Sequence, residues 1–360
     1  MMDVSGFIEE LEENNVGLIV GVPDSLLKEF CSGVEHHENH VIAPNEGAAI
    51  GIAAGAYLSS GRIPLVYMQN SGLGNAINPL TSLADPAVYA IPMVLLIGWR
   101  GEPGVKDEPQ HVKQGSITPQ LLDTIGVPYH VLTDSRAVRE AFEDAQTRSG
   151  PVALLVQKGT FVTTSLEREE STAREAVIES IITALPPDAA IVSTTGKTSR
   201  ELYEIRERNG QGHEHDFLTV GSMGHASQIA LGISKYSKKH IVCLDGDGAA
   251  LMHLGGMSAI GTHKANLLHV ILNNKSHESV GGQPTSGPDV DFVSIALACG
   301  YKRAQRIEGQ EDIHQLVRDF LVDGPNLIEV RIEQGSRKNL ARPREKPTEN
   351  KEAFIRHLRS

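Results

Sequence analysis

The chain has 360 residues, of which 40% are hydrophobic and 22% are charged, as in a soluble globular protein of about two domains. Its formal net charge of −12 disfavours binding to nucleic acid or to an anionic membrane, but leaves room for a small anionic substrate at a locally positive site. The longest apolar runs, such as residues 91–99, are strand length and too short to cross a bilayer. Residues 1–15 are acidic without an apolar signal core, and the three cysteines are scattered, so we expect a cytoplasmic protein.

Apolar, strand-like runs alternate with helical patterns along the first half of the chain. Strands are predicted over 16–23, 40–44, 63–69, 91–99 and 151–159. A run of small apolar residues, 46–61, predicts a helix that ends at Gly61. Glu46, at its start, has two interpretations. The helix dipole favours an acid in any first turn, but the apolar helix predicts a buried N-terminus, where an acid can exchange a proton with a ligand.

The second half repeats this alternation after a polar, charged linker, 163–175. Strands are predicted over 189–196, 217–221, 240–248, 267–274 and 326–332. Strands that are apolar on both faces and alternate with helices are typical of parallel sheets covered on both sides. We therefore predict an α/β protein with two doubly wound parallel-sheet domains, 1–162 and 176–335. A charged tail, 336–360, follows them and is either a docking arm or mobile.

Two strands of the second half end in polar turns. Asp247 lies between Gly246 and Gly248, and Asn274 ends the next strand, about one strand–helix–strand crossover later. Ligands bind at the carboxyl ends of parallel strands, and carboxylate and amide oxygens suit Mg²⁺ that also binds phosphate. The glycines allow close approach of a ligand, and the helix predicted from Ala249 directs N–H groups at a phosphate. Each turn alone is an ordinary tight turn, but the pair indicates a metal and diphosphate site.

The spacing of these turns resembles the magnesium and diphosphate motif of the thiamine diphosphate enzymes. The resemblance implies that Asp247, Asn274 and the backbone carbonyl of Ser276 bind Mg²⁺. It also implies that the turn from Gly246 to Ala249 binds the diphosphate of the cofactor.

Two further turns match the same enzymes. The resemblance places Thr198 and Ser199 near the diphosphate, although either could instead be a helix N-cap. It also implies that the Gly221 carbonyl accepts the aminopyrimidine N–H and that Met223 wedges between the two cofactor rings. Without the resemblance, Met223 would be assigned to the core.

The resemblance gives Glu46 the role of the acid at the pyrimidine nitrogen N1′. Thiamine diphosphate enzymes usually place the pyrimidine-binding and diphosphate-binding domains of one site on different subunits. This chain carries one of each, which implies a homodimer at least and possibly a tetramer. The chain also lacks room for the middle domain of larger decarboxylases, which narrows the choice to the compact members.

Four loops after strands are rich in Gly, Pro and small polar residues: 21–25, 68–80, 98–111 and 276–287. With the motifs above, they resemble the phosphonopyruvate decarboxylase family over about residues 10–335. The implied reaction converts 3-phosphonopyruvate to phosphonoacetaldehyde and CO₂, in phosphonate biosynthesis. By analogy with acid–histidine pairs of related decarboxylases, Asp24, Ser25 and His111 are candidates for the proton transfer that follows loss of CO₂.

Other interpretations remain open at this point. Asp24 also suits a Pro-Asp-Ser turn, and His111 a solvated position. A phosphonate dianion needs cations, and Arg100, Lys106 and Lys275 are the candidates. Sulfopyruvate decarboxylase shares many of these loops. A doubly wound nucleotide- or metabolite-binding protein without catalysis would also have Gly-rich turns, but has no need of Glu46 beside the metal motif.

Overall fold

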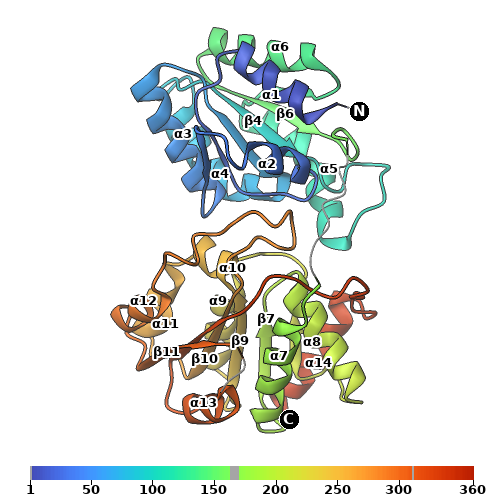
Figure 1. Cartoon of the computed structure of the whole chain (residues 1–360), viewed down its shortest axis with the longest axis vertical. Helices are drawn as coiled ribbons and strands as arrows, with labels where there is room; N and C mark the ends of the chain where they lie inside the picture. The colour runs from blue at the N-terminus through green and yellow to red at the C-terminus, as the bar shows by residue number, and fades with distance from the viewer. Residues whose placement is uncertain (1, 163–169, 310–311) are drawn as a thin grey trace. The chain divides into compact units, whose positions relative to one another are not determined.

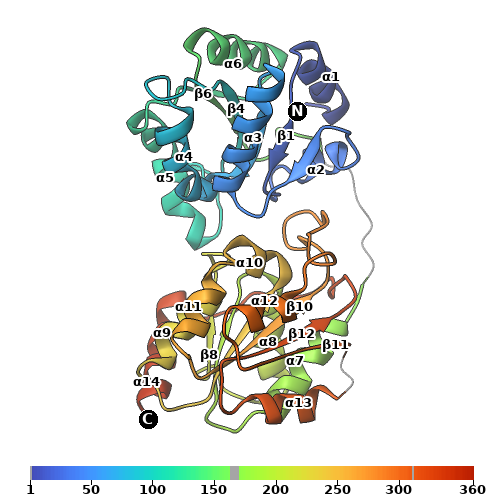
Figure 2. The same cartoon turned by 90° about the vertical axis from the view of Figure 1, so that its left-hand side faces the viewer.

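The computed structural model describes residues 2–162, 170–309 and 312–360 (Figure 1, Figure 2). The chain divides into two compact units. The first contains the described residues up to 162 together with Val280–Gln283, and the second contains the other described residues. No helix in these described ranges is long and apolar enough to cross a membrane.

The first unit contains a six-stranded parallel sheet in the order β2-β1-β3-β4-β6-β5. Its strands are β1 (Ile19–Gly21), β2 (His40–Ile42), β3 (Leu65–Gln69), β4 (Met93–Gly98), β5 (Tyr129–Val131) and β6 (Pro151–Val156). Its helices are α1 (Val4–Glu13), α2 (Lys28–Val34), α3 (Glu46–Ser60), α4 (Leu73–Pro79), α5 (Pro109–Thr124) and α6 (Ser135–Arg148). Helices α1, α2 and α6 cover one face through a core around Phe7 and Phe30, and α3, α4 and α5 cover the other around Ile50 and Leu73 (Figure 1).

The second unit has its own six-stranded parallel sheet, in the order β11-β12-β10-β9-β7-β8. Its strands are β7 (Ala190–Ser193), β8 (Asp216–Leu218), β9 (Ile241–Gly246), β10 (Leu267–Asn273), β11 (Arg303–Glu308) and β12 (Asn326–Arg331). Its helices are α7 (Ala173–Ala184), α8 (Lys197–Arg208), α9 (Ala226–Ser234), α10 (Asp247–Met252), α11 (Gly256–Thr262), α12 (Phe292–Ala298), α13 (Ile313–Phe320) and α14 (Pro347–Arg359). A core around Ile178 and Leu202 fills one face, and a core around Met257 and Phe292 fills the other.

The two sheets have the same topology, and the predicted fold class is confirmed. In each, the first strand lies between the second and the third, so the strand order reverses beside it. A crevice for ligands forms at the carboxyl ends of the strands at such a switch point. In the first unit Asp24 and Gln69 lie there, at the ends of β1 and β3. In the second unit Thr194 and Gly246 lie there, at the ends of β7 and β9.

All ten predicted strands are present, but the sequence does not predict β5 or β11. Both lie at a sheet edge. β5 has only three residues, all half-buried, and four of the six side chains of β11 are polar or charged, including Arg303 and Arg306. Neither strand has the continuous apolar run from which the other strands were predicted, which explains why both were missed.

The predicted helix over 46–61 is confirmed as α3. The Asn45 side chain accepts the N–H of Ala48 at 2.9 Å, and Gly61 ends the helix with a φ of 68°.

The charged tail forms α14, which packs against the edge strand β8. Asn350 Nδ2 donates to the Asp216 carbonyl at 2.8 Å, and its Oδ1 accepts the N–H of Leu218 at 3.1 Å. Phe354 of the same helix is 3% exposed. The last part of the tail therefore packs on the second unit.

Candidate active site

The predicted metal ligands of the second unit lie at the adjacent carboxyl ends of β9 and β10. Gly246 pairs with Leu272 across these strands, so Asp247 and Asn274 follow directly beyond the paired residues. Asp247 is 1% exposed. Burial raises the pKa of its carboxyl to about 6, against the opposite effect of hydrogen bonds from the Thr285 hydroxyl and from backbone N–H groups that include that of Asn274. A buried carboxylate with this preference for a proton also favours a cation.

Gly287 lies beside the Asp247 carboxylate, and its lack of a side chain leaves room for that group. A Cβ at Gly287 would lie 2.7 Å from Asp247 Oδ2, 2.9 Å from Asn273 Oδ1 and 3.0 Å from Thr285 Oγ1. Thr285 Oγ1 donates to Asp247 Oδ2 and accepts the Gly287 N–H at 3.1 Å. Three side-chain oxygens therefore converge on a point where an added Cβ would clash. The hydroxyl of Ser276, the third predicted ligand residue, is also buried and has no hydrogen-bond partner within the part of the chain that the structure describes. This donor set fits a hard cation such as Mg²⁺.

The two asparagines have different surroundings. Asn273 is fully buried, and its amide donates to the Gly287 carbonyl at 3.1 Å and to Glu329 Oε1 at 2.9 Å. Asn274 donates to Glu278 Oε2 at 2.7 Å, while its Oδ1 accepts the N–H of Ser276 at 3.2 Å. Asn273 therefore holds the loop to the sheet, and Asn274 keeps a carbonyl oxygen for a ligand.

The turn after β7 shows which residue begins α8. Gly196, with φ 95°, is the N-cap, so neither Thr198 nor Ser199 has the alternative role of capping the helix. Ser199 Oγ lies 2.7 Å from Ser193 Oγ and donates to the Thr194 carbonyl at 2.7 Å. Ser199 therefore fastens the start of α8 to β7. Thr198 is 6% exposed on the first turn of the same helix.

The loop between β8 and α9 carries Gly221 and Met223, which are both half-buried. Met223 is absent from the hydrophobic clusters of the second unit, so it is not a core residue. Ser222 and Gly224, with φ of 52° and 85°, form the bend around it. An apolar side chain held on a bent, partly exposed loop is available to contact a ligand.

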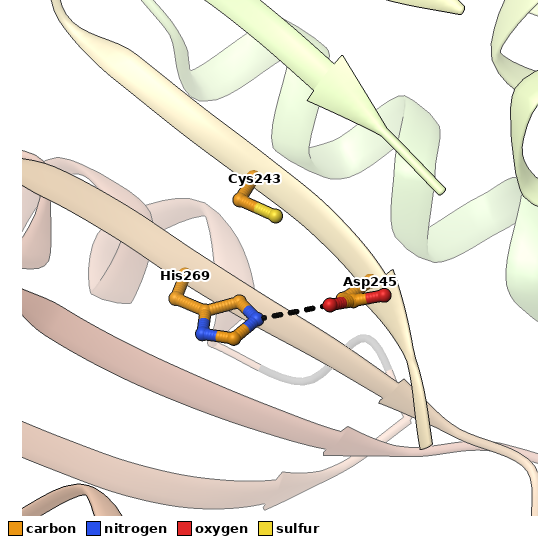
Figure 3. Close-up of side chains that lie close together, drawn as sticks. All are labelled: Cys243, Asp245 and His269. Carbon is orange, nitrogen blue, oxygen red and sulfur yellow. Dashed lines mark ion pairs between the residues drawn. The ribbon is translucent and has the colours of Figure 1, made fainter. Parts of the chain in front are cut away.

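Three further potential metal ligands, Cys243, Asp245 and His269, gather behind the turn (Figure 3). Their ligand atoms lie within 4.8 Å of one another, and all three are buried. His269 Nε2 lies 3.4 Å from Asp245 Oδ2, and its Nδ1 lies 3.2 Å from the Tyr301 hydroxyl. Asp245 Oδ1 accepts the N–H of Gly246 at 3.1 Å. Because burial raises the pKa of the Cys243 thiol well above its usual value, this cluster suits the positioning of the turn better than a second metal.

In the first unit, Glu46 is buried at the N-terminus of α3, as the apolar helix predicts. Its side chain is 5% exposed, and its Oε2 accepts a hydrogen bond from Asn75 Nδ2 at 2.7 Å. A Cβ at Gly72 would lie 2.4 Å from Glu46 Oε1. The loop 68–80 thus provides a hydrogen-bond donor, Asn75, and a glycine against which the carboxyl group packs. The sequence singles out this loop but not Asn75 or Gly72.

Asp24 lies fully buried after β1. Gln69 Nε2 donates to its Oδ1 at 2.5 Å, and the N–H of Leu26 donates to its Oδ2 at 3.0 Å. A Cβ at Gly98 would lie 2.2 Å from Asp24 Oδ2. Burial raises the pKa of Asp24 despite these hydrogen bonds and the nearby Arg100.

Arg100 joins Ser25 to the loop 98–111. Its Nη1 donates to Ser25 Oγ at 2.6 Å, and its Nε and Nη2 donate to the two oxygens of Asp107 at 2.7 and 2.5 Å. These hydrogen bonds lower the pKa of Asp107 to about 2. Asp107, which the sequence analysis missed, therefore fixes the direction of the Arg100 guanidinium.

His111 lies on the first turn of α5 and is half-buried, so it is not a fully solvated histidine. Burial, and then the charge of Arg100, lower the pKa of its imidazole to about 4, against the opposing effect of Asp107. The structure thus brings Asp24, Ser25 and His111 into one neighbourhood around Arg100. Lys106 and Lys275 are exposed side chains, the first in this unit and the second in the other.

Both units of the chain match families of known proteins. The family described as the thiamine pyrophosphate (diphosphate) enzyme N-terminal TPP binding domain matches residues 4–123, and the corresponding C-terminal TPP binding domain matches 194–330. A phosphonopyruvate decarboxylase of Streptomyces hygroscopicus is 36% identical over 97% of this chain and 92% of its own length. The chain belongs to the phosphonopyruvate decarboxylase family of thiamine diphosphate enzymes. It is a decarboxylase whose cofactors are thiamine diphosphate and a divalent metal such as Mg²⁺.

Two other known decarboxylases are similar to the chain. A phosphonopyruvate decarboxylase of Streptomyces viridochromogenes is 36% identical over 97% of this chain and 93% of its own. A sulfopyruvate decarboxylase of Methanosarcina acetivorans is 27% identical over 87% of this chain and 86% of its own. The predicted resemblance is therefore confirmed, and the interpretation as a binding protein without catalysis is not supported.

Proposed function

We propose that the enzyme decarboxylates 3-phosphonopyruvate to phosphonoacetaldehyde and CO₂, in phosphonate biosynthesis. The supporting observation is the 36% identity to phosphonopyruvate decarboxylases along nearly the whole of both chains, against 27% for the sulfopyruvate decarboxylase. Sulfopyruvate decarboxylation is the second candidate, because the relative that carries that name also matches most of the chain.

We propose that the two units bind different parts of the cofactor. Residues 1–162 would bind the pyrimidine end of the cofactor and residues 176–335 its diphosphate, with 163–175 as the linker and 336–360 as the tail. When bound, thiamine diphosphate supplies the electron sink for the carbanion left by CO₂. Glu46 would hold a proton at the pyrimidine nitrogen N1′, a role supported by its burial and by the Asn75 hydrogen bond.

The diphosphate end is proposed to use the groups that converge beside Gly287. Asp247, the Asn274 amide oxygen and the Ser276 carbonyl would bind Mg²⁺, supported by the burial of the Asp247 carboxylate and by its place beside Asn274 at the ends of adjacent strands. The diphosphate oxygens would be bound by the turn from Gly246 to Ala249 and by the start of α8 at Thr198 and Ser199. The pyrimidine and thiazolium rings would be bound by Gly221 and Met223.

Proton transfer after CO₂ loss is proposed for the group around Arg100. Asp24 is the better proton donor, because burial raises its pKa and keeps it protonated to higher pH. His111, with a pKa of about 4, is neutral near pH 7 and suits a hydrogen-bonding or proton-accepting role. Ser25 would orient the substrate through Arg100.

Arg100 is the proposed ligand of the phosphonate. Three of its N–H groups bond Asp107 and Ser25. A guanidinium has five N–H donors, so two remain for an anion. Lys106 and Lys275 are exposed and offer no comparable fixed geometry.

The direct experiment is competition among three keto acids for the purified enzyme with thiamine diphosphate and Mg²⁺. We expect phosphonopyruvate to have the highest kcat/KM, sulfopyruvate a lower one, and pyruvate the lowest. A higher kcat/KM for sulfopyruvate would establish the second candidate. Equal values for all three would refute anion recognition while leaving the cofactor assignment intact.

We further propose a homodimer at least, possibly a tetramer, in the cytoplasm. Helix α3 supports self-association, because it is apolar on nearly every side and leaves Ile52 and Leu58 37% and 73% exposed. The three cysteines are all free, which suits a reducing compartment. Sedimentation equilibrium tests the assembly: Leu58→Glu should shift it towards the monomer, and a wild-type monomer would refute the proposal.

A further inference from the structure

A buried network of ionic groups contacts the amide of the metal-ligand candidate Asn274 through Glu278. Glu278 is at its centre and accepts hydrogen bonds from Arg174 Nη1 at 2.8 Å and from Lys197 Nζ at 2.7 Å. Arg174 also forms a two-bond pair with Glu201, at 2.6 and 2.8 Å. Arg174, Glu201 and Glu278 are each less than a tenth exposed. The network joins α7, α8 and the loop after β10, and its formal charges of two cations and two carboxylates balance.

The carboxylate of Glu278 also determines which way the Asn274 amide points. Asn274 Nδ2 donates to Glu278 Oε2 at 2.7 Å. A carboxylate accepts hydrogen bonds and cannot donate them, so only the NH₂ end of the amide can face it. The oxygen end of Asn274 must then face away from Glu278, on the side where it also accepts the N–H of Ser276.

We propose that Glu278 is a positioning residue for the metal: held in place by Arg174 and Lys197, it fixes the Asn274 amide with its oxygen towards the Mg²⁺ site. This inference rests on the proposed role of Asn274 as a metal ligand. Groups that orient a metal ligand through a hydrogen bond commonly change metal affinity about 10- to 100-fold when they are replaced.

Replacement of Glu278 by glutamine removes this constraint with little change in shape. One end of the new amide is a donor. If this donor takes the place of Oε1, it meets Lys197 Nζ; if it takes the place of Oε2, it meets Arg174 Nη1 and drives the Asn274 amide to turn its NH₂ end towards the metal. Arg174 keeps its pair with Glu201, and Lys197 keeps its 2.7 Å bond to Ser336 Oγ, so Glu278→Gln leaves no isolated buried charge.

Glu201→Gln is the matched control. It also loses one carboxylate of Arg174, at a residue 1% exposed, but Glu201 has no contact with Asn274 among the hydrogen bonds of the described residues. A purely structural role for the network predicts similar effects of the two substitutions. A positioning role predicts that only Glu278→Gln weakens metal binding.

The measurement is the Mn²⁺ affinity of the full chain with saturating thiamine diphosphate, from the electron paramagnetic resonance signal of free Mn²⁺. We expect about a 10- to 100-fold weaker affinity for Glu278→Gln, a change within about threefold for Glu201→Gln, and recovery of most of kcat for Glu278→Gln at high Mg²⁺. Unchanged affinity in Glu278→Gln, or equal losses in both variants, would overturn the proposal.

Two further variants keep the result interpretable. Asn274→Ala should lose Mn²⁺ affinity; if it does not, the assignment of the metal ligand itself fails, which is a different outcome from an unchanged Glu278→Gln. If Glu278→Gln does not fold, Glu278→Asp replaces it. This variant keeps the charge but withdraws the acceptor by one methylene, and it must weaken Mn²⁺ binding more than Glu201→Asp for the proposal to stand.

Discussion

Asn75 of α4 donates its amide to Glu46 Oε2 at 2.7 Å, across the N-terminus of α3. The bond engages one carboxyl oxygen of Glu46, and the missing side chain of Gly72 leaves space beside the other. The Glu46 carboxyl group is thus held between the Asn75 amide and the backbone of Gly72. The first two predictions concern this pair of contacts.

Glu46→Gln should fold and retain some cofactor affinity but lose most turnover, because an amide cannot pass a proton to N1′. The measurement is the rate of hydrogen–deuterium exchange at C2 of the bound cofactor, followed by nuclear magnetic resonance. Glu9→Gln, an exposed acid of α1, is the control and should exchange at the wild-type rate. Exchange in Glu46→Gln as fast as in the wild type would show that Glu46 is not the activating acid.

Gly72→Ala should reduce turnover by about tenfold or more, since small displacements of a catalytic group have effects of this size. The added Cβ would lie 2.4 Å from Glu46 Oε1 and must displace the carboxyl group. Gly6→Ala, in a helix with nothing within 4 Å of the new Cβ, is the control and should be neutral. If Gly72→Ala has wild-type kcat, the space beside Glu46 has no part in its placement.

Asp247→Ala should abolish Mg²⁺-dependent cofactor binding, because the proposed site loses its only charged protein ligand. Isothermal titration calorimetry with thiamine diphosphate, with and without Mg²⁺, measures the effect. Asp319→Ala, at an exposed position of α13, should bind as the wild type does. Cofactor affinity that remains metal-dependent in Asp247→Ala would contradict the assignment.

The sequence predicts residues that belong to a motif of fixed spacing. It does not predict which other residues the fold places beside that motif. Asp247 and Asn274 end neighbouring strands, so their meeting follows from the strand pattern. Thr285, Gly287 and Glu278 reach the same place through a loop with little regular structure, and their contacts depend on how that loop folds back. The loop was recognised as ligand-like from its composition, but composition does not tell which of its side chains face inward.

Asp107, the partner of Arg100, was missed for a similar reason. Arg100 and Asp107 lie in one charged loop, where an ion pair and two solvated side chains have the same sequence pattern. Only the bidentate geometry distinguishes them. The pattern that predicted both sheets likewise failed only at β5 and β11, which lack a continuous apolar run.

His111 should make the stability of the enzyme depend on pH. Burial and Arg100 lower its pKa to about 4, below the value near 6.5 of an unfolded histidine, so the unfolded chain binds the proton first. Stability is therefore fully present above pH about 6.5 and is lost as the pH falls towards 4, by about 1 kcal/mol after allowance for screening at a half-buried site. Urea unfolding from pH 7.5 to 4.5 should show a smaller loss in His111→Gln than in the wild type. Equal losses would contradict the assigned shift.

Arg100 should determine substrate selectivity, and Arg100→Gln tests this directly. The variant keeps a polar side chain but loses the charge and the fork that Asp107 holds in place. A site built to pair a dianion discriminates by roughly 10⁴-fold or more against a substrate that leaves its donors unpaired, so most of the preference for phosphonopyruvate over pyruvate should disappear. The expected change is a large rise in KM for phosphonopyruvate with little change for pyruvate. Arg136→Gln, which removes an exposed pair with Glu140, is the control and should keep wild-type selectivity. If Arg100→Gln lowers kcat/KM equally for both keto acids, Arg100 supports the loop and does not recognise the phosphonate.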